Sequence, residues 1–169
     1  TGTHTPTVSP DGRFAAVGFS SDSVPPDLFL TRLVGPVEER RVTNSPRADF
    51  GTYRWVTPRY VTFKQHQDGA TLHGRLLLPP DFDPGKKYPA ILGSVYSNTV
   101  RNQWGGRTAH PVWGLDQYLA QEGYVILNVD ISGSSGRGKA FRQRIKLDYG
   151  GIDVEDLYSG VLYLKSLGY

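Results

Sequence analysis

The sequence predicts an α/β fold that is preceded by a short all-β segment. Two nearly continuous apolar runs, 90–96 and 125–130, have the composition of strands buried on both faces of a sheet. A pattern typical of an amphipathic helix follows each run. Strands that alternate with helices over short connections indicate a right-handed parallel arrangement. Residues 1–45 differ, because turn signals separate short strand-like runs there.

The all-β segment is expected to hold two strands, at 14–19 and 27–33, with a candidate third at 41–43. The turn sequence Ser-Pro-Asp-Gly at 9–12 precedes the first of them. Because so few strands cannot close a hydrophobic core, the segment needs neighbours, as propeller blades do. Residues 46–58 include two prolines and are expected to form a linker.

A hairpin is predicted at the start of the α/β part. Strand patterns at 60–67 and 71–78 flank an Asp-Gly pair, which is typical of a two-residue type I′ turn. Such a turn would place His66 and His73 on one face of the hairpin as diagonal neighbours. A metal site would need a third ligand, and the sequence marks none nearby. We therefore expect a partly exposed polar face and no metal.

Two helices are predicted from apolar spacing and terminal signals. The first has Pro111 in its first turn and Gly123 in the C′ position. The second starts with Asp153 as N-cap, carries acids in its first turn and ends before Gly168. The apolar positions at helical spacing are Val112, Leu115 and Leu119 in the first helix, and Val154, Leu157, Val161 and Leu164 in the second.

Length and composition limit the class of protein. The 169 residues suffice for one domain or two partial ones, and a hydrophobic content of 38% can supply a core. A net charge of only +3 gives no reason to expect a nucleic acid or a membrane surface as partner. The absence of cysteine excludes disulfides, thiolate zinc sites and a cysteine nucleophile. The apolar runs are far shorter than the roughly 20 residues of a membrane span.

A glycine-rich stretch follows the second buried run. Residues 133–139 nearly match a phosphate-binding loop that ends in Lys139, but Ala140 stands where the motif requires Ser or Thr to hold magnesium. We therefore favour a glycine-rich turn and keep a P-loop-like nucleotide-binding module as an alternative. The basic run at 137–146 is expected to be a solvated helix face with one buried apolar stripe, rather than a nucleic-acid patch.

Nucleophilic catalysis by a serine of this chain is not predicted. Ser134 lies between a strand and a helix, where an α/β hydrolase carries its nucleophile, but the pattern Gly-x-Ser-x-Gly fails around it. A Ser-His-Asp mechanism in that fold also requires a histidine downstream of the nucleophile. All the histidines precede this stretch: His4, His66, His73 and His110.

Tyr96 is the candidate catalytic residue. It closes the buried run at 90–96 and precedes a polar stretch, Ser-Asn-Thr at 97–99, so its hydroxyl could donate a hydrogen bond at the edge of a cleft. The alternative is a tyrosine that buries its ring and hydrogen-bonds locally. The residues alone leave both alternatives open.

Three motifs in this order resemble the prolyl oligopeptidase family, in particular its dipeptidyl peptidase IV and acylaminoacyl peptidase branches. They are DGATLHGRLLLPP at 68–80, KKYP at 86–89 leading to the Val-Tyr pair that ends in Tyr96, and NVDISGSSGRG at 128–138. Members of this family are serine peptidases with a β-propeller and an α/β-hydrolase domain. The resemblance covers residues 59–169, and the motif SPDGR makes residues 1–45 similar to a last propeller blade.

The resemblance implies the N-terminal half of an α/β-hydrolase sheet over 59–169, preceded by the linker and the strands of a partial propeller blade. In this family the tyrosine that matches Tyr96 donates its hydroxyl to the oxyanion of the tetrahedral intermediate. The chain departs from the family pattern at 97–99, where Gly-Gly or Ala-Gly-Pro is usual, and at Ser132, where arginine is usual.

The resemblance also implies what the chain does and lacks. Relatives carry the nucleophile, the acid and the histidine after the helix that matches 153–167, so the chain would end before its nucleophile elbow. Since it begins with Thr1 and contains no methionine, we expect a piece of a longer protein. The resemblance implies that the parent is a serine peptidase that hydrolyses peptide bonds in short peptides, and that this chain, which lacks the triad, is inactive alone. An α/β-hydrolase esterase is the alternative.

The remaining expectations concern partners and location. No cofactor or metal is implied, and the expected partner is the peptide substrate. An unfinished parallel sheet would expose an edge through which the chain could self-associate. The sequence leaves the compartment open, and the family favours a periplasmic or secreted location.

Overall fold

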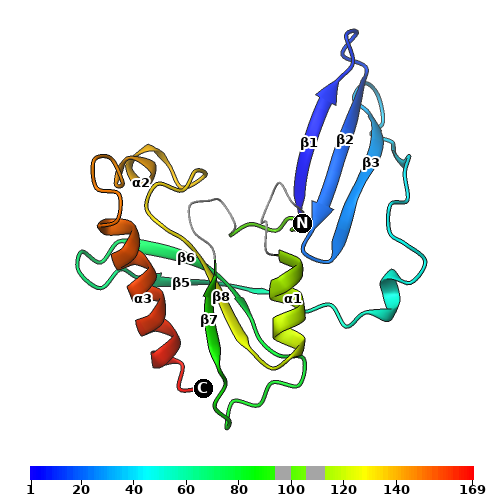
Figure 1. Cartoon of the computed structure of the whole chain (residues 1–169). Coiled ribbons are helices and arrows are strands. Elements are labelled where there is room, and N and C mark those ends of the chain that lie inside the picture. Colours follow the sequence, from blue (N-terminus) through cyan, green and yellow to red (C-terminus); the bar gives the residue numbers. More distant parts are fainter. Residues whose placement is uncertain (94–99, 106–112) are drawn as a thin grey trace. The chain divides into compact units, whose positions relative to one another are not determined.

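The computed structural model describes residues 1–93, 100–105 and 113–169, which divide into two compact units (Figure 1). The first unit comprises Thr1–Trp55 and Asn102–Trp104, and the second comprises Val56–Arg101 and Gly105–Tyr169. The sequence predicts a blade over 1–45 and a linker over 46–58, whereas the first unit continues to Trp55.

The first unit is built on an antiparallel sheet in the order β1-β2-β3-β4. Its strands are β1 (Thr3–Val8), β2 (Phe14–Ser21), β3 (Val24–Arg32) and β4 (Glu39–Arg41). β2 and β3 confirm the two predicted strands, and β4 overlaps the candidate third, 41–43, only at Arg41. The sequence did not predict β1, because Thr-His-Thr-Pro-Thr-Val is mostly polar and contains a proline, which weakens a strand pattern. The predicted turn joins β1 to β2, with Gly12 at a φ of 70°.

A buried carboxylate on β3 fastens the segment after β4 to the sheet. Asp27 is 4% exposed and accepts hydrogen bonds from the Arg41 guanidinium, from Thr43 Oγ1 at 2.7 Å and from the Ser45 amide at 2.9 Å. Burial by itself raises the pKa of Asp27, but these hydrogen bonds outweigh burial and hold the pKa below its ordinary value of 3.8. The fold therefore stabilises the charged form of this side chain.

Aromatic side chains from two distant stretches of sequence pack together in the first unit. Phe50, in the 3₁₀ turn Phe50–Thr52, stacks on Trp55 with ring centres 5.1 Å apart. Trp104 meets these two rings at 5.4 and 5.3 Å. The indole of Trp55 also donates a hydrogen bond to the Phe50 carbonyl at 3.0 Å. Part of the segment predicted as a linker is therefore packed.

The second unit contains a mixed sheet in the order β5-β6-β8-β7. Its strands are β5 (Arg59–Lys64), β6 (Thr71–Leu77), β7 (Ala90–Gly93) and β8 (Val125–Asp130). The helices are α1 (Trp113–Gln121), α2 (Lys139–Gln143) and α3 (Ile152–Ser166). β7 and β8 are parallel and α1 lies between them in the chain, which confirms the predicted strand-helix-strand unit. The hairpin joins this pair with antiparallel strands.

β8 is buried on both faces, as its continuous apolar sequence predicts. On one face, Val125, Leu127 and Val129 belong to the core against which α3 packs. On the other face, Ile126 clusters with Ala120 of α1. The two helices therefore cover opposite faces of the sheet (Figure 1).

The hairpin between β5 and β6 closes at Lys64 and Thr71, so its loop is wider than the predicted two-residue turn. Gln65 explains the difference, because its buried side-chain oxygen accepts hydrogen bonds from the loop amides of Gln67 at 2.5 Å and Asp68 at 2.8 Å. His66 lies in this loop and His73 lies on β6. The predicted pairing of the two histidines is therefore wrong.

α3 starts at Ile152, and Asp153 is not its N-cap. The carboxylate of Asp148 accepts a hydrogen bond from the Ile152 amide at 3.0 Å. Asp153 is buried inside the first turn, where it accepts one from the Gly150 amide at 2.8 Å. A turn at Gly150 and Gly151 brings Asp148 to the N-terminus of α3. The spacing of residues in the sequence does not indicate this turn.

A buried polar pair leaves no space for a side chain at Gly93. Asn128 donates a hydrogen bond from Nδ2 to Asp116 Oδ2 at 2.9 Å, and a Cβ at position 93 would overlap Asn128 Oδ1. We expect Gly93→Ala to lower the free energy of unfolding by about 1–3 kcal/mol, the usual cost of overpacking, in urea titrations followed by circular dichroism. Gly114→Ala on α1 meets no atom within 4 Å and is the matched control. Equal losses in the two variants would contradict this account.

Asp27→Asn tests the buried carboxylate of the first unit. Because the folded-state pKa of Asp27 lies below 3.8, its stabilisation is complete above that value and is lost as the pH falls through the folded-state pKa. Between about pH 6 and about pH 2, the unmodified chain should lose more unfolding free energy than the variant does. Asp83→Asn, in a turn of the second unit, is the control. Identical pH profiles of the chain with and without Asp27 would refute the assignment.

Candidate active site

The carboxyl ends of the parallel strands β7 and β8 lie at one edge of the second unit's sheet. β7 ends at Gly93 and β8 ends at Asp130. In open sheets with parallel strands, ligands bind in the crevice outside the carboxyl ends. This edge is therefore the candidate site.

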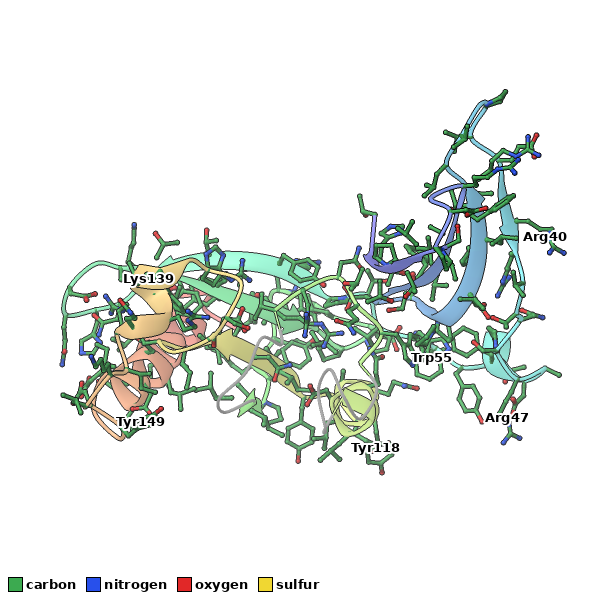
Figure 2. The ribbon with its side chains drawn as sticks, turned by 90° about the horizontal axis from the view of Figure 1, so that it is seen from above. Arg40, Arg47, Trp55, Tyr118, Lys139 and Tyr149 are labelled. Atoms are coloured by element: carbon green, nitrogen blue, oxygen red, sulfur yellow. The ribbon has the colours of Figure 1, made fainter. Side chains whose placement is uncertain are left out.

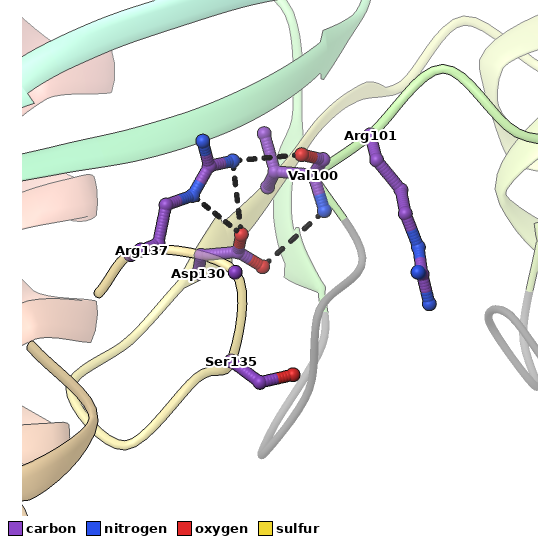
Figure 3. A pocket seen from close by; sticks show the side chains of 6 residues that line it. Val100, Arg101, Asp130, Ser135 and Arg137 are labelled. Carbon is purple, nitrogen blue, oxygen red and sulfur yellow. Dashed lines mark hydrogen bonds and ion pairs between the residues drawn. The ribbon is translucent and has the colours of Figure 1, made fainter. Parts of the chain in front are cut away.

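Asp130 and Arg137 form an ion pair at this edge, and both hold the backbone of Val100 (Figure 3). Asp130 Oδ2 accepts hydrogen bonds from Arg137 Nε at 3.2 Å and from Nη2 at 3.1 Å. Asp130 Oδ1 accepts one from the Val100 amide at 3.2 Å, and Arg137 Nη2 donates to the Val100 carbonyl at 2.7 Å. This Asp130–Arg137 clamp fixes the chain at Val100 against the end of β8.

A pocket of about 140 Å³ opens beside the clamp. It is lined by Val100, Arg101, Asp130, Ser135, Gly136 and Arg137. The lining holds two guanidinium groups and a single carboxylate, so positive charge predominates. A pocket of this size and sign suits a small polar or anionic group.

His73 faces Asp130 from the neighbouring strand β6. Burial lowers the pKa of His73 below its ordinary value of 6.5, and the positive charge of Arg137 lowers the pKa further against the opposing effect of Asp130. The imidazole therefore stays neutral at neutral pH, and the cations of this edge are arginines.

The glycine-rich stretch after β8 is a tight turn. Gly133 has a φ of 97°, and a Cβ there would come within 2.7 Å of Ile145 Cγ2, so only glycine fits. Its amide donates to the Phe141 carbonyl at 3.1 Å, and the Ser134 amide donates to the Ile131 carbonyl at 3.0 Å. These amides are used within the chain, whereas a phosphate loop directs such amides at its ligand. Lys139 lies exposed on α2 (Figure 2).

A second buried network ties this turn to α3 and to the hairpin loop. The Ser132 amide donates to Asp156 Oδ2 at 2.6 Å, and Ser132 Oγ accepts from Arg144 Nε at 2.8 Å. Arg144 also pairs with Asp68 at 2.7 Å. Burial raises the pKa of Asp156, although the bonds from Ser132 and the charge of Arg144 act against it.

The sequence predicts that the basic run at 137–146 is a solvated helix face. The structure corrects this prediction, because only part of the run is helical and exposed. α2 ends at Gln143, so Arg137 precedes the helix and Arg144 follows it. Both guanidinium groups reach carboxylates and are mostly buried, with 24% and 23% of their side-chain surface exposed. Arg137 pairs with Asp130, seven residues earlier at the end of β8, whereas the partner of Arg144, Asp68, lies far away in the sequence, where the local pattern of charges gives no signal of it.

A Ser-His-Glu arrangement occurs elsewhere in the second unit but has no access to substrate. His66 contacts Ser159 Oγ through Nδ1 at 3.0 Å and Glu155 Oε2 through Nε2 at 3.3 Å. Ser159 is only 2% exposed, and its hydroxyl donates to the Glu155 carbonyl at 2.8 Å. The three residues hold the hairpin loop against α3, and a serine so buried cannot attack a peptide.

The sequence-predicted site residues have different outcomes. Tyr96 lies outside the described residues. Ser134 is 4% exposed and is therefore hidden from substrate. In residues 1–93, 100–105 and 113–169, no group of three or more His, Asp or Glu side chains is placed to hold a metal ion. Within the same residues, no helix has the length and apolarity to cross a membrane.

Known proteins resemble the chain in sequence. Residues 114–169 match the profile of the prolyl oligopeptidase family. Dipeptidyl-peptidase 5 of Porphyromonas gingivalis is 36% identical over 104 residues, which cover 60% of this chain and 14% of that protein. Human dipeptidyl peptidase 8 is 34% identical over 113 residues, covering 65% of this chain and 12% of that protein. The chain thus spans a small part of the length of these relatives.

Solved structures resemble it across both units. A dipeptidyl aminopeptidase IV candidate from Bacteroides ovatus gives a TM-score of 0.81 at 30% identity, covering 99% of this chain and 23% of that one. Dipeptidyl peptidase 4 of Porphyromonas gingivalis gives a TM-score of 0.82 at 23% identity, covering 99% of this chain and 24% of that one. This similarity supports the fold alone. Together with the profile match, these similarities make the prolyl oligopeptidase family the one that the chain resembles in sequence and in fold.

Proposed function

We propose that this chain is part of a serine peptidase that hydrolyses peptide bonds in short peptides, as a dipeptidyl or acylaminoacyl peptidase does. The similarity to dipeptidyl peptidases supports the reaction class. The carboxyl edge of β7 and β8, with its polar pocket, supports the place where the substrate binds.

The proposed architecture follows the sequence prediction. The strands within residues 1–45 form part of a propeller blade, residues 46–58 connect, and residues 59–169 form the N-terminal part of an α/β-hydrolase domain. The nucleophilic serine, its histidine and its acid then come from outside this chain. The 169 residues alone are accordingly proposed to be inactive.

Tyr96 is proposed to donate its hydroxyl to the oxyanion of the tetrahedral intermediate. The observation that supports this role best is the fixing of the chain on both sides of Tyr96. Gly93 pairs with Asn128 of β8, and Val100 is held by the Asp130–Arg137 clamp. Hydrogen bonds to the oxyanion accelerate a reaction when their donor is preorganised for the transition state.

Two alternatives remain distinguishable by experiment. An α/β-hydrolase esterase would cleave acyl esters without cleaving peptides. A nucleotide-binding module is less well supported, because the amides of Ser132, Gly133 and Ser134 bond within the chain. Retention on immobilised ATP that is lost in Lys139→Ala would support the nucleotide alternative.

The proposed function is tested by the hydrolysis of dipeptide nitroanilides and of matched esters, using native protein that contains this chain. We expect peptide cleavage that a fluorophosphonate abolishes. In that protein, Tyr96→Phe should lower kcat about 10²–10³-fold with little change in KM, since the donor acts on the transition state. Tyr118→Phe, on the exposed face of α1 (Figure 2), is the control. Ester cleavage alone, or full activity in Tyr96→Phe, would contradict the proposal.

A further inference from the structure

The pocket beside the clamp contains one cation whose charge no described residue neutralises. Both oxygens of Asp130 accept hydrogen bonds, Oδ2 from Arg137 and Oδ1 from the Val100 amide. Arg137 is thereby paired. Arg101 lines the same pocket, and within the described ranges no hydrogen bond or ion pair joins its guanidinium to another residue.

The direction of the two arginines separates their roles. Figure 3 shows the Arg137 guanidinium turned toward Asp130 and the Val100 carbonyl, whereas the Arg101 side chain extends away from this cluster. Arg101 is exposed, and fixing its side chain on a ligand costs side-chain entropy that the interaction must offset. Ser135, which is also exposed, adds a hydroxyl to the lining. One pocket therefore combines a structural arginine with an arginine available to a ligand.

The chemistry of the lining identifies the class of ligand. A guanidinium presents a planar fork of donors that matches a carboxylate with two parallel hydrogen bonds. Counting Arg101, Arg137 and Asp130, the pocket has an excess of one positive charge, which one carboxylate would neutralise. A volume of about 140 Å³ accommodates such a group.

We propose that Arg101 binds a carboxylate of the peptide substrate in this pocket and makes acidic peptides the preferred substrates. The proposal rests on the proposed peptidase function and adds the substrate class. The carboxylate has two sources, the side chain of an aspartate or glutamate and the free C-terminus of the peptide. The guanidinium recognises both in the same way.

The binding experiment uses the ¹⁵N-labelled 169-residue chain and three small ligands. Acetyl-glutamate amide carries only a side-chain carboxylate, acetyl-glutamine carries only a terminal one, and acetyl-glutamine amide carries none. We expect at least one of the two anions to shift the amide resonances of Ser135 and Gly136 in a saturable way, and the neutral ligand not to do so. Whichever anion binds identifies the source of the carboxylate.

Variants of Arg101 separate this interaction from general charge attraction. Arg101→Gln should weaken the apparent affinity about tenfold, as for the loss of a hydrogen bond to a charged group, and Arg101→Lys should retain part of it. Arg142→Gln is the matched control, because Arg142 is also exposed in the second unit and its removal changes the net charge equally. Equal shifts by the neutral ligand, or unchanged affinity in Arg101→Gln, would overturn the proposal.

The outcome is distinct from that of the peptidase test. Carboxylate-specific binding without peptide cleavage by the native protein would contradict the proposed function and leave the anion site standing. Peptide cleavage without carboxylate-specific shifts would contradict the anion site alone.

Discussion

The burial of Asp130 at the end of β8 is the constraint on which the candidate site depends. A carboxylate that is 2% exposed would be destabilising without partners, because desolvation of a charge costs far more than the fold gains from any single contact. Arg137 and the Val100 amide supply those partners. In meeting this requirement, they bind the glycine-rich turn and the chain after β7 to the same strand end. The pocket is a consequence, since it lies between these three parts.

The same physical requirement recurs at other buried carboxylates. Asp27 accepts a hydrogen bond from the Ser45 amide, in the segment after β4. Asp156 accepts one from the Ser132 amide, and Asp116 accepts one from the Asn128 side chain. In each case an acid on a strand or helix is satisfied by a group from a different segment. Removing one partner would leave a buried group unsatisfied, so these contacts specify which segments meet as well as stabilising them. Arg101, without such a partner among the described residues, stands apart from this pattern.

The sequence predicted those features that depend on local periodicity. The apolar runs at β7 and β8 gave a parallel pair with a helix between, and α3 followed at its expected place. Features that depend on distant partners were not predictable. Gln65 widened the hairpin loop through its own side chain, and Arg144 found Asp68 and Ser132 across the fold. The role of Tyr96 comes from the resemblance to the family, and it stays a prediction.

The most direct test of the central claim is to isolate the native protein from its source, measure its intact mass and map the residue that a fluorophosphonate labels. The account predicts a mass well above 18.7 kDa and one labelled serine that lies beyond Tyr169 in sequence. Labelling of a serine within residues 1–169 would contradict it. So would a native protein of 18.7 kDa that remains unlabelled, because the two units would then serve binding and not peptide hydrolysis.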